Sequence, residues 1–134
     1  IVNVSSAGQA PIDFGDVMLE RDYAPSRAYA QSKLAQIMHT FDLAGAHQPA
    51  RMTANTLHPA TYMPTKIVLH ARGSALSSLE EGEEATERLV ADPELAAVTG
   101  HYFDGLSEAR ANPQAYDEDA RGRLRELSLQ VTRP

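Results

Sequence analysis

The sequence predicts an α/β fold built around a parallel sheet, and three observations support this prediction. An apolar, β-branched run at residues 1–6 has the composition of a strand that is covered on both faces, as parallel strands are. A stretch with helical spacing follows it, and a second strand-like run lies at residues 52–58. Strand, helix and strand in this order form a right-handed crossover, which places the two strands parallel in one sheet.

The helix between these strands is the longest predicted element. Residues 7–25 are expected to form a loop, because proline and glycine interrupt them. The helix is expected to begin at Ser26, a suitable N-cap, and to stop near Gly45. Its apolar positions recur with the spacing of one buried helix face: Ala30, Leu34, Ile37, Met38 and Phe41.

The second half of the chain predicts further helices and one more strand. Residues 62–77 offer only short helical possibilities, since proline and glycine interrupt them. The pattern Ser-Leu-Glu-Glu at 78–81 is a capping box, and it opens a helix expected to reach about Val90, with an exposed acidic face. Residues 101–103 are expected to form a third short strand. An amphipathic helix from Asp117 closes the chain.

Composition excludes several classes of protein. A chain of 134 residues is at most one domain, and its net charge of -6 argues against nucleic-acid binding by phosphate neutralisation. No cysteine is present, so disulfides and thiolate metal sites are excluded, and a cytoplasmic location is expected. The apolar runs are too short to span a membrane. A metal is not expected, because no two histidines have helical metal-site spacing: His39, His47, His58, His70 and His101.

Three residues predict the chemistry of the chain: Ser6, Tyr29 and Lys33. Tyr29 and Lys33 are four positions apart in the predicted helix, so the phenol and the ammonium share one face. A cation beside a phenol lowers the pKa of the phenol and makes it usable as an acid/base. Ser6 ends the first strand, where its hydroxyl can bind the same substrate oxygen. These groups together suit the interconversion of an alcohol and a carbonyl.

The motifs around these residues resemble the classical short-chain dehydrogenase/reductase family. Val-Asn-Val-Ser-Ser-Ala-Gly at 2–8, Ala-Tyr-Ala-Gln-Ser-Lys-Leu-Ala at 28–35 and the strand-like run at 53–59 follow the family's order and approximate spacing. Gly-His-Tyr-Phe at 100–103 is similar to the last strand of that fold, within the branch that contains retinol dehydrogenases. The resemblance implies the C-terminal half of a Rossmann-type doubly wound parallel sheet, with residues 1–134 as its catalytic and substrate side.

The resemblance also implies a role for each residue. Tyr29 would be the general acid/base, Ser6 would hydrogen-bond the substrate oxygen, and Lys33 would bind the nicotinamide ribose hydroxyls. Ser6 is preferred to Ser5, which should point to the opposite side of the strand. The family's fourth catalytic residue, an asparagine on an earlier helix, has no counterpart in this sequence.

A second segment, which follows the second strand, is similar to the family's cofactor loop. Residues 58–61, His-Pro-Ala-Thr, resemble the turn that faces the nicotinamide carboxamide, although Ala60 replaces the usual glycine. The resemblance implies cofactor contacts from Pro59, Ala60 and Thr61, with Thr65 as a further candidate. Tyr62 and Met63 would lie near the nicotinamide or the substrate, or would serve in ordinary loop packing.

Two readings of function remain open at this point. The first is an oxidoreductase that uses NAD or NADP and a small alcohol or carbonyl substrate, assembled as a homodimer or homotetramer. Its pairing face would be the Tyr29 helix, with Gln36, Thr40 and Leu43 pointing outward. The second is a non-catalytic or truncated dehydrogenase-like domain that acts in assembly. A glycine-rich phosphate turn is absent from the 134 residues, so this chain alone is expected to be inactive.

Overall fold

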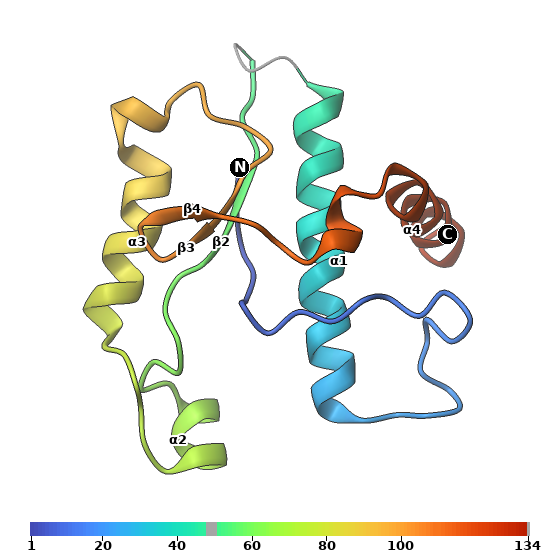
Figure 1. Cartoon of the computed structure of the whole chain (residues 1–134), viewed down its shortest axis with the longest axis horizontal. Helices are drawn as coiled ribbons and strands as arrows, with labels where there is room; N and C mark the ends of the chain where they lie inside the picture. Colours follow the sequence, from blue (N-terminus) through green and yellow to red (C-terminus); the bar gives the residue numbers. More distant parts are fainter. Residues whose placement is uncertain (48–50, 134) are drawn as a thin grey trace.

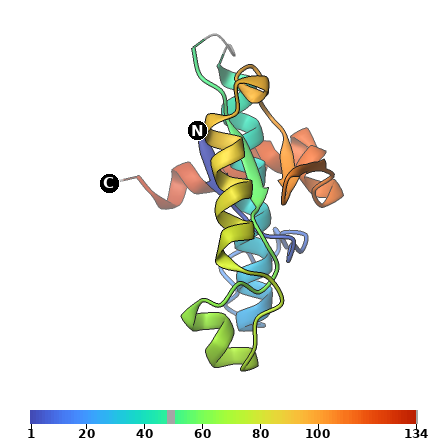
Figure 2. The same cartoon turned by 90° about the vertical axis from the view of Figure 1, so that its left-hand side faces the viewer.

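The computed structural model describes residues 1–47 and 51–133. Its sheet lies between two helices, α1 (Pro25–Ala46) on one face and α3 (Leu79–Ala91) on the other (Figure 1). The closing helix α4 (Glu118–Val131) packs outside α1 and projects away from the body, as the turned view shows (Figure 2). The α/β class and the partial Rossmann-like architecture that the sequence predicts are therefore confirmed.

The sheet has four strands in the order β1-β2-β3-β4. The first three, β1 (Val2–Val4), β2 (Asn55–His58) and β3 (Tyr102–Asp104), run parallel. β1 and β2 are shorter than the sequence predicts, although the backbone N–H of Ser5 still donates to Leu57, at 2.7 Å. Because the strands are parallel, their carboxyl ends meet at one edge, where the serines and the His-Pro turn follow them.

The fourth strand, β4 (Ser107–Ala109), is antiparallel to β3 and was missed in the sequence. Two residues, Gly105 and Leu106, join the two strands. Gly105 has φ 57°, at the first central position, where type II′ hairpin turns place glycine. Asp-Gly between two short strand-like runs is a hairpin signal, so this strand could have been predicted from the sequence.

α1 begins one residue earlier than predicted and does not use the expected cap. Ala24 is its N-cap, without a side-chain hydrogen bond, and Pro25 occupies the first turn. Proline is favoured there because its φ is already helical and its missing N–H would have had no partner. Gly45, expected to stop the helix, lies within it, since the helix ends at Ala46.

The starts of α3 and α4 follow side-chain caps. Ser78 Oγ accepts from the backbone N–H of Glu81 at 3.1 Å, as the capping box predicts. Asp117 caps α4 in the same way, through the N–H of Ala120 at 3.1 Å. The segment at 62–77 contains a short helix, α2 (Lys66–Arg72), all of whose side chains are at least partly exposed. Two 3-10 turns complete the fold: η1 (Pro93–Leu95) and η2 (Pro113–Tyr116).

Two apolar clusters hold the helices to the sheet. Adjacent residues of β3 point to opposite faces, so Tyr102 joins the cluster under α1 and Phe103 joins the cluster under α3. Leu34, Ile37 and Met38 of α1 are fully buried. Burial, assisted by nearby Asp104, raises the pKa of Tyr102 to about 12, so this phenol stays protonated in the core.

One exposed position predicted on α1 is in fact interior. Thr40 was expected to point outward, toward a partner helix, but it is fully buried. Its hydroxyl donates to the carbonyl of Gln36 and accepts from Asn3 Nδ2, both at 2.8 Å. Thr40 therefore belongs to the contact between α1 and β1, and it cannot form part of a pairing face.

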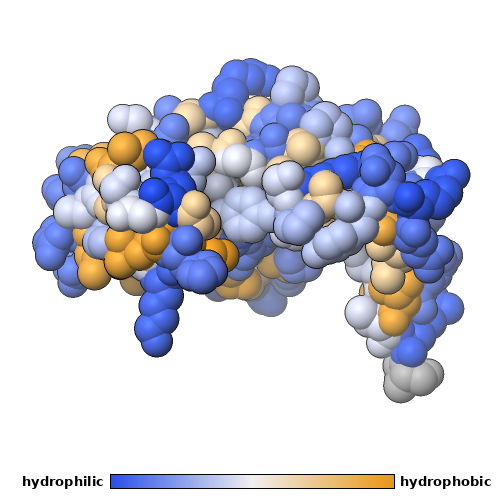
Figure 3. Space-filling view, turned by 90° about the horizontal axis from the view of Figure 1, so that it is seen from below, coloured by the Kyte–Doolittle hydropathy of each residue, from blue (hydrophilic) through white to orange (hydrophobic). Residues whose placement is uncertain are grey.

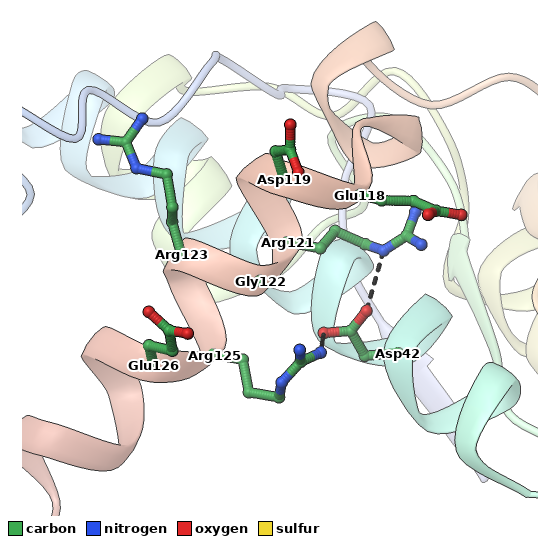
Figure 4. A pocket seen from close by; sticks show the side chains of 8 residues that line it. All are labelled: Asp42, Glu118, Asp119, Arg121, Gly122, Arg123, Arg125 and Glu126. Atoms are coloured by element: carbon green, nitrogen blue, oxygen red, sulfur yellow. Dashed lines mark hydrogen bonds and ion pairs between the residues drawn. The ribbon is translucent and has the colours of Figure 1, made fainter.

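Two ion pairs connect α4 to α1 (Figure 4). Asp42 of α1 accepts from Arg121 and from Arg125 of α4, both at 2.9 Å. Arg121 also donates to the carbonyl of Ala115, at 3.0 Å. The hollow beside these groups, about 840 Å³, is lined by seven charged side chains and one glycine: Asp42, Glu118, Asp119, Arg121, Gly122, Arg123, Arg125 and Glu126. Three of these charged side chains, Asp42, Arg121 and Arg125, form the ion pairs between the two helices.

The surface carries apolar side chains at two ends of the molecule (Figure 3). One group lies over the end formed by α2, where Ile67 and Leu69 are exposed, and the other lies along α4, where Leu129 and Val131 are exposed. Among residues 1–47 and 51–133, no helix has the combined length and apolarity needed to cross a membrane.

Candidate active site

A cavity of about 790 Å³ opens at the carboxyl edge of β1 and β2. Its walls come from the turn after β1, one face of α1, the segment after β2, and α2. All seven residues that the sequence singles out for catalysis or cofactor binding line it: Ser6, Tyr29, Lys33, Pro59, Ala60, Thr61 and Thr65. Residues separated by up to 59 positions are therefore brought to one cavity by the parallel topology.

Tyr29 and Lys33 lie on the same face of α1, as their spacing predicts. Lys33 Nζ is 5.8 Å from the centroid of the Tyr29 ring. The ring is about half exposed, at 48%, so its hydroxyl is accessible from the cavity.

Ser6 is close to the Tyr29 ring, with Gly8 between them. A methyl group built on Gly8 would lie 3.5 Å from Ser6 Oγ and 3.7 Å from Tyr29 Cε1. The serine hydroxyl and the phenol ring therefore flank one small volume that only glycine leaves free. The Ser6 hydroxyl and the edge of the Tyr29 ring therefore border the same part of the cavity.

The two neighbouring serines use their hydroxyls in opposite ways. Ser5 Oγ donates to the carbonyl oxygen of Lys33 at 2.9 Å, so its hydrogen is committed to α1. Ser6 Oγ accepts from the backbone N–H of Gly8 at 3.0 Å, which uses an oxygen lone pair and leaves its hydrogen to donate to a substrate. This difference favours Ser6 over Ser5 as the substrate-binding serine.

The segment after β2 is held by His58. Its Nε2 lies 2.9 Å from Thr61 Oγ1, which closes the turn over Pro59 and Ala60. Thr65 is the N-cap of α2, but its hydroxyl makes no cap hydrogen bond and lines the cavity. Thr61, Thr65 and the turn between them thus contribute polar groups to the cavity wall.

Burial lowers the pKa of His58 from its ordinary 6.5, although nearby Asp104 raises it in part. The folded protein therefore holds this imidazole neutral, while the unfolded chain binds a proton near 6.5. The stability that the neutral ring contributes is present above that value and is lost as the pH falls through the lower, folded pKa.

We expect the midpoint of urea unfolding to fall between about pH 7 and about pH 5, and to fall less in His58→Gln than in the parent protein. His39→Gln, at an exposed position of α1, is the matched control and should follow the parent curve. Identical pH dependence of His58→Gln and the parent protein would contradict the assignment.

Several cavity residues were not anticipated as such. His58 was placed in the segment that resembles the cofactor turn and counted among five scattered histidines, but it was given no role of its own, although its place at the carboxyl end of a parallel strand was an available signal. α2 contributes Ile67, Val68 and Arg72 to the wall, but its sequence gives no motif that indicates this. The guanidinium of Arg72 stacks on the Tyr62 ring, 4.0 Å from its centroid.

Tyr62 and Met63 both line the cavity. Tyr62 has φ 50°, which non-glycine residues seldom adopt, and this conformation turns the chain toward α2. Met63 packs onto Gly82 of α3 so closely that a methyl group built on Gly82 would overlap the Met63 sulfur.

In the described part of the chain, no three His, Asp or Glu side chains are arranged to hold a metal.

A serine, a tyrosine and a lysine thus line one cavity at the carboxyl edge of a parallel sheet of the α/β class. No family model matches the chain. It is 36% identical to human retinol dehydrogenase 13 over 92% of this chain and 43% of that protein. It is 31% identical to human retinol dehydrogenase 14, and 28% identical to human polyprenol dehydrogenase. The chain thus belongs to the short-chain dehydrogenase/reductase family.

A solved structure gives the same result for the fold. An uncharacterised protein from Mycobacterium paratuberculosis superposes with a TM-score of 0.71 at 26% identity, over 98% of this chain and 49% of that one. The chain spans about two fifths of the length of the curated relatives it matches, from 38% to 44% for the dehydrogenases named above and their mouse orthologues. It corresponds to their C-terminal portions.

Proposed function

We propose that this chain forms the catalytic side of a nicotinamide-dependent dehydrogenase that interconverts an alcohol and a carbonyl. The observation that carries the proposal is the placement of Ser6, Tyr29 and Lys33 around one cavity, with the Ser6 hydroxyl and the Tyr29 ring flanking the same volume. The oxidoreductases among its relatives support this choice of reaction.

The three residues divide the proton chemistry. Ser6 donates its free hydrogen to the substrate oxygen and fixes the position of that oxygen. Tyr29 takes the hydroxyl proton when an alcohol is oxidised and returns it when a carbonyl is reduced. The Lys33 ammonium, 5.8 Å from the ring centroid, stabilises the phenolate form of Tyr29, which is present before the proton is taken and again after it is returned.

The residues of the cavity also fit a nicotinamide nucleotide, either NAD or NADP. Lys33 offers hydrogen-bond donors for ribose hydroxyls, while Thr61, Thr65 and the turn at Pro59 and Ala60 offer polar groups for the carboxamide. When bound, the nicotinamide supplies or accepts the hydride. The protein's own part is to orient the substrate carbon toward that ring and to move the proton.

The substrate is proposed to be a small molecule with an apolar body. Val4, Met63, Ile67 and Val68 line the cavity around the polar centre, so a hydrocarbon group buried there would gain about 25 cal/mol per Å² removed from water. The polar end of such a molecule would sit between Ser6 and Tyr29. A single hydroxyl or carbonyl on an apolar skeleton satisfies both requirements.

The direct test uses the full-length protein with NAD and NADP and a panel of apolar primary and secondary alcohols and their carbonyl counterparts. Oxidation or reduction of the nucleotide, followed at its near-ultraviolet absorbance, is the expected result, and Ser6→Ala should remove most of it. Failure to bind either nucleotide, measured by calorimetric titration, would overturn the proposal and favour a role in assembly.

Lys33→Met is expected to reduce two quantities together. The variant keeps the length of the side chain but loses the charge and the donors, so nucleotide affinity and kcat should both fall, each by about 10-fold or more. Titration gives the first quantity and steady-state kinetics the second. A fall in kcat at unchanged nucleotide affinity would remove Lys33 from the ribose-binding role.

A further inference from the structure

Two side-chain hydrogen bonds connect the strand that carries Ser6 to the helix that carries Tyr29. Asn3 lies in β1 and Ser5 directly follows it, two positions further along the chain, so both side chains face α1. Asn3 Nδ2 donates to Thr40 Oγ1 at 2.8 Å, and Ser5 Oγ donates to the carbonyl oxygen of Lys33 at 2.9 Å. Both hydroxyl-bearing residues are buried, with Ser5 5% exposed and Thr40 0%.

The Ser5 bond differs from the Asn3 bond in what it holds. It ends on Lys33 itself, and the ammonium of the same lysine donates to the carbonyl oxygen of Val4 at 3.2 Å. Two consecutive residues, Val4 and Ser5, therefore hold Lys33 at both its backbone and its charged end. The Asn3 bond lies two helical turns further along α1, away from the cavity.

We propose that Ser5 is a positioning residue that acts through Lys33 and keeps the serine strand in register with the tyrosine-lysine helix. This inference rests on the proposed function, since it assigns Ser5 a part in the same reaction. Ser5 commits its hydrogen to α1, so it does not touch the substrate oxygen. Its contribution is to fix where the ammonium lies relative to the Tyr29 ring and the Ser6 hydroxyl.

Removal of this hydroxyl should affect the reaction more than the fold. In a regular helix the Lys33 carbonyl also accepts a hydrogen bond from the backbone N–H four residues later. The Lys33 carbonyl therefore keeps a hydrogen-bond partner in Ser5→Ala. Small displacements of positioned groups can cost up to about 100-fold in rate. We expect kcat to fall about 10-fold in Ser5→Ala and nucleotide affinity to weaken several-fold, with the unfolding midpoint nearly unchanged.

Thr40→Val is the matched control. It removes the other link between β1 and α1 and leaves the amide of Asn3 without its acceptor, which costs about 1–3 kcal/mol of stability. We expect Thr40→Val to lower the unfolding midpoint while kcat and nucleotide affinity stay near those of the parent protein. A purely structural role for Ser5 predicts the same behaviour in both variants, so equal effects on kcat would overturn the proposal.

The coupling between Ser5 and Lys33 is tested by a double-mutant cycle on nucleotide affinity in the full-length protein. Since Ser5 acts through Lys33, Ser5→Ala should weaken affinity in the parent protein but not in Lys33→Met. Additive effects would overturn the inference. Parent-like kinetics in Ser5→Ala would also overturn it, while loss of turnover in Ser6→Ala would leave the proposed function intact. Full activity in Ser6→Ala and Tyr29→Phe would instead refute the proposed function.

Discussion

Replacement of Tyr29 by phenylalanine is expected to lower kcat by about 10²–10⁴-fold, because removal of a general acid/base typically costs that much. The phenyl ring keeps the position of the Tyr29 ring beside Gly8. It cannot exchange a proton with the substrate oxygen. Nucleotide affinity should change little, because Lys33 and the turn after β2 are untouched.

Steady-state kinetics and nucleotide titration of the full-length protein check this result. Tyr23→Phe is the matched control, since Tyr23 is 68% exposed and does not line the cavity. It should retain full activity. If Tyr29→Phe kept more than about a tenth of the parent kcat, the phenol would not be the acid/base of the reaction.

Ile37→Ala is expected to have the largest effect on stability. Ile37 is fully buried in the cluster between α1 and the sheet, so alanine removes apolar contacts and leaves a cavity. Such changes cost about 2–5 kcal/mol, which is a large part of the free energy of unfolding of a typical domain. Urea denaturation should show the midpoint falling accordingly.

The same substitution at Ile67 provides the comparison. Ile67 lies in α2 and is 74% exposed, so little apolar area is lost, and alanine has the higher helix propensity. We expect a change within about 0.5 kcal/mol. A similar loss of stability in both variants would show that burial does not account for the effect at Ile37.

The parts of the fold that depend on local sequence were predictable. Ser78 and Asp117 cap their helices at the expected places, and the crossover of β1, α1 and β2 follows from the order of apolar patterns. Tyr29 and Lys33 share a face because helical spacing alone requires it. Thr40 was placed wrongly, since the choice between an exposed and a buried polar residue depends on Asn3, 37 positions away.

The wall of the cavity could not be predicted in full for the same reason. α2 reaches the site through the conformation of Tyr62, a positive φ that neither its own residue type nor its neighbours indicate. The triad carries a recognisable spacing, whereas Ile67, Val68 and Arg72 are placed only by the path of the chain between β2 and α3.

The contact between Gly82 and Met63 has a consequence for engineering the protein. Gly82 does not line the cavity, yet any side chain there would displace Met63, which does. The outline of the cavity is therefore controlled in part from a helix behind its wall. A search for variants that accept bulkier or slimmer substrates should vary position 82 together with the lining residues. A methyl group added to Gly82 would displace the Met63 thioether, which is part of the cavity wall.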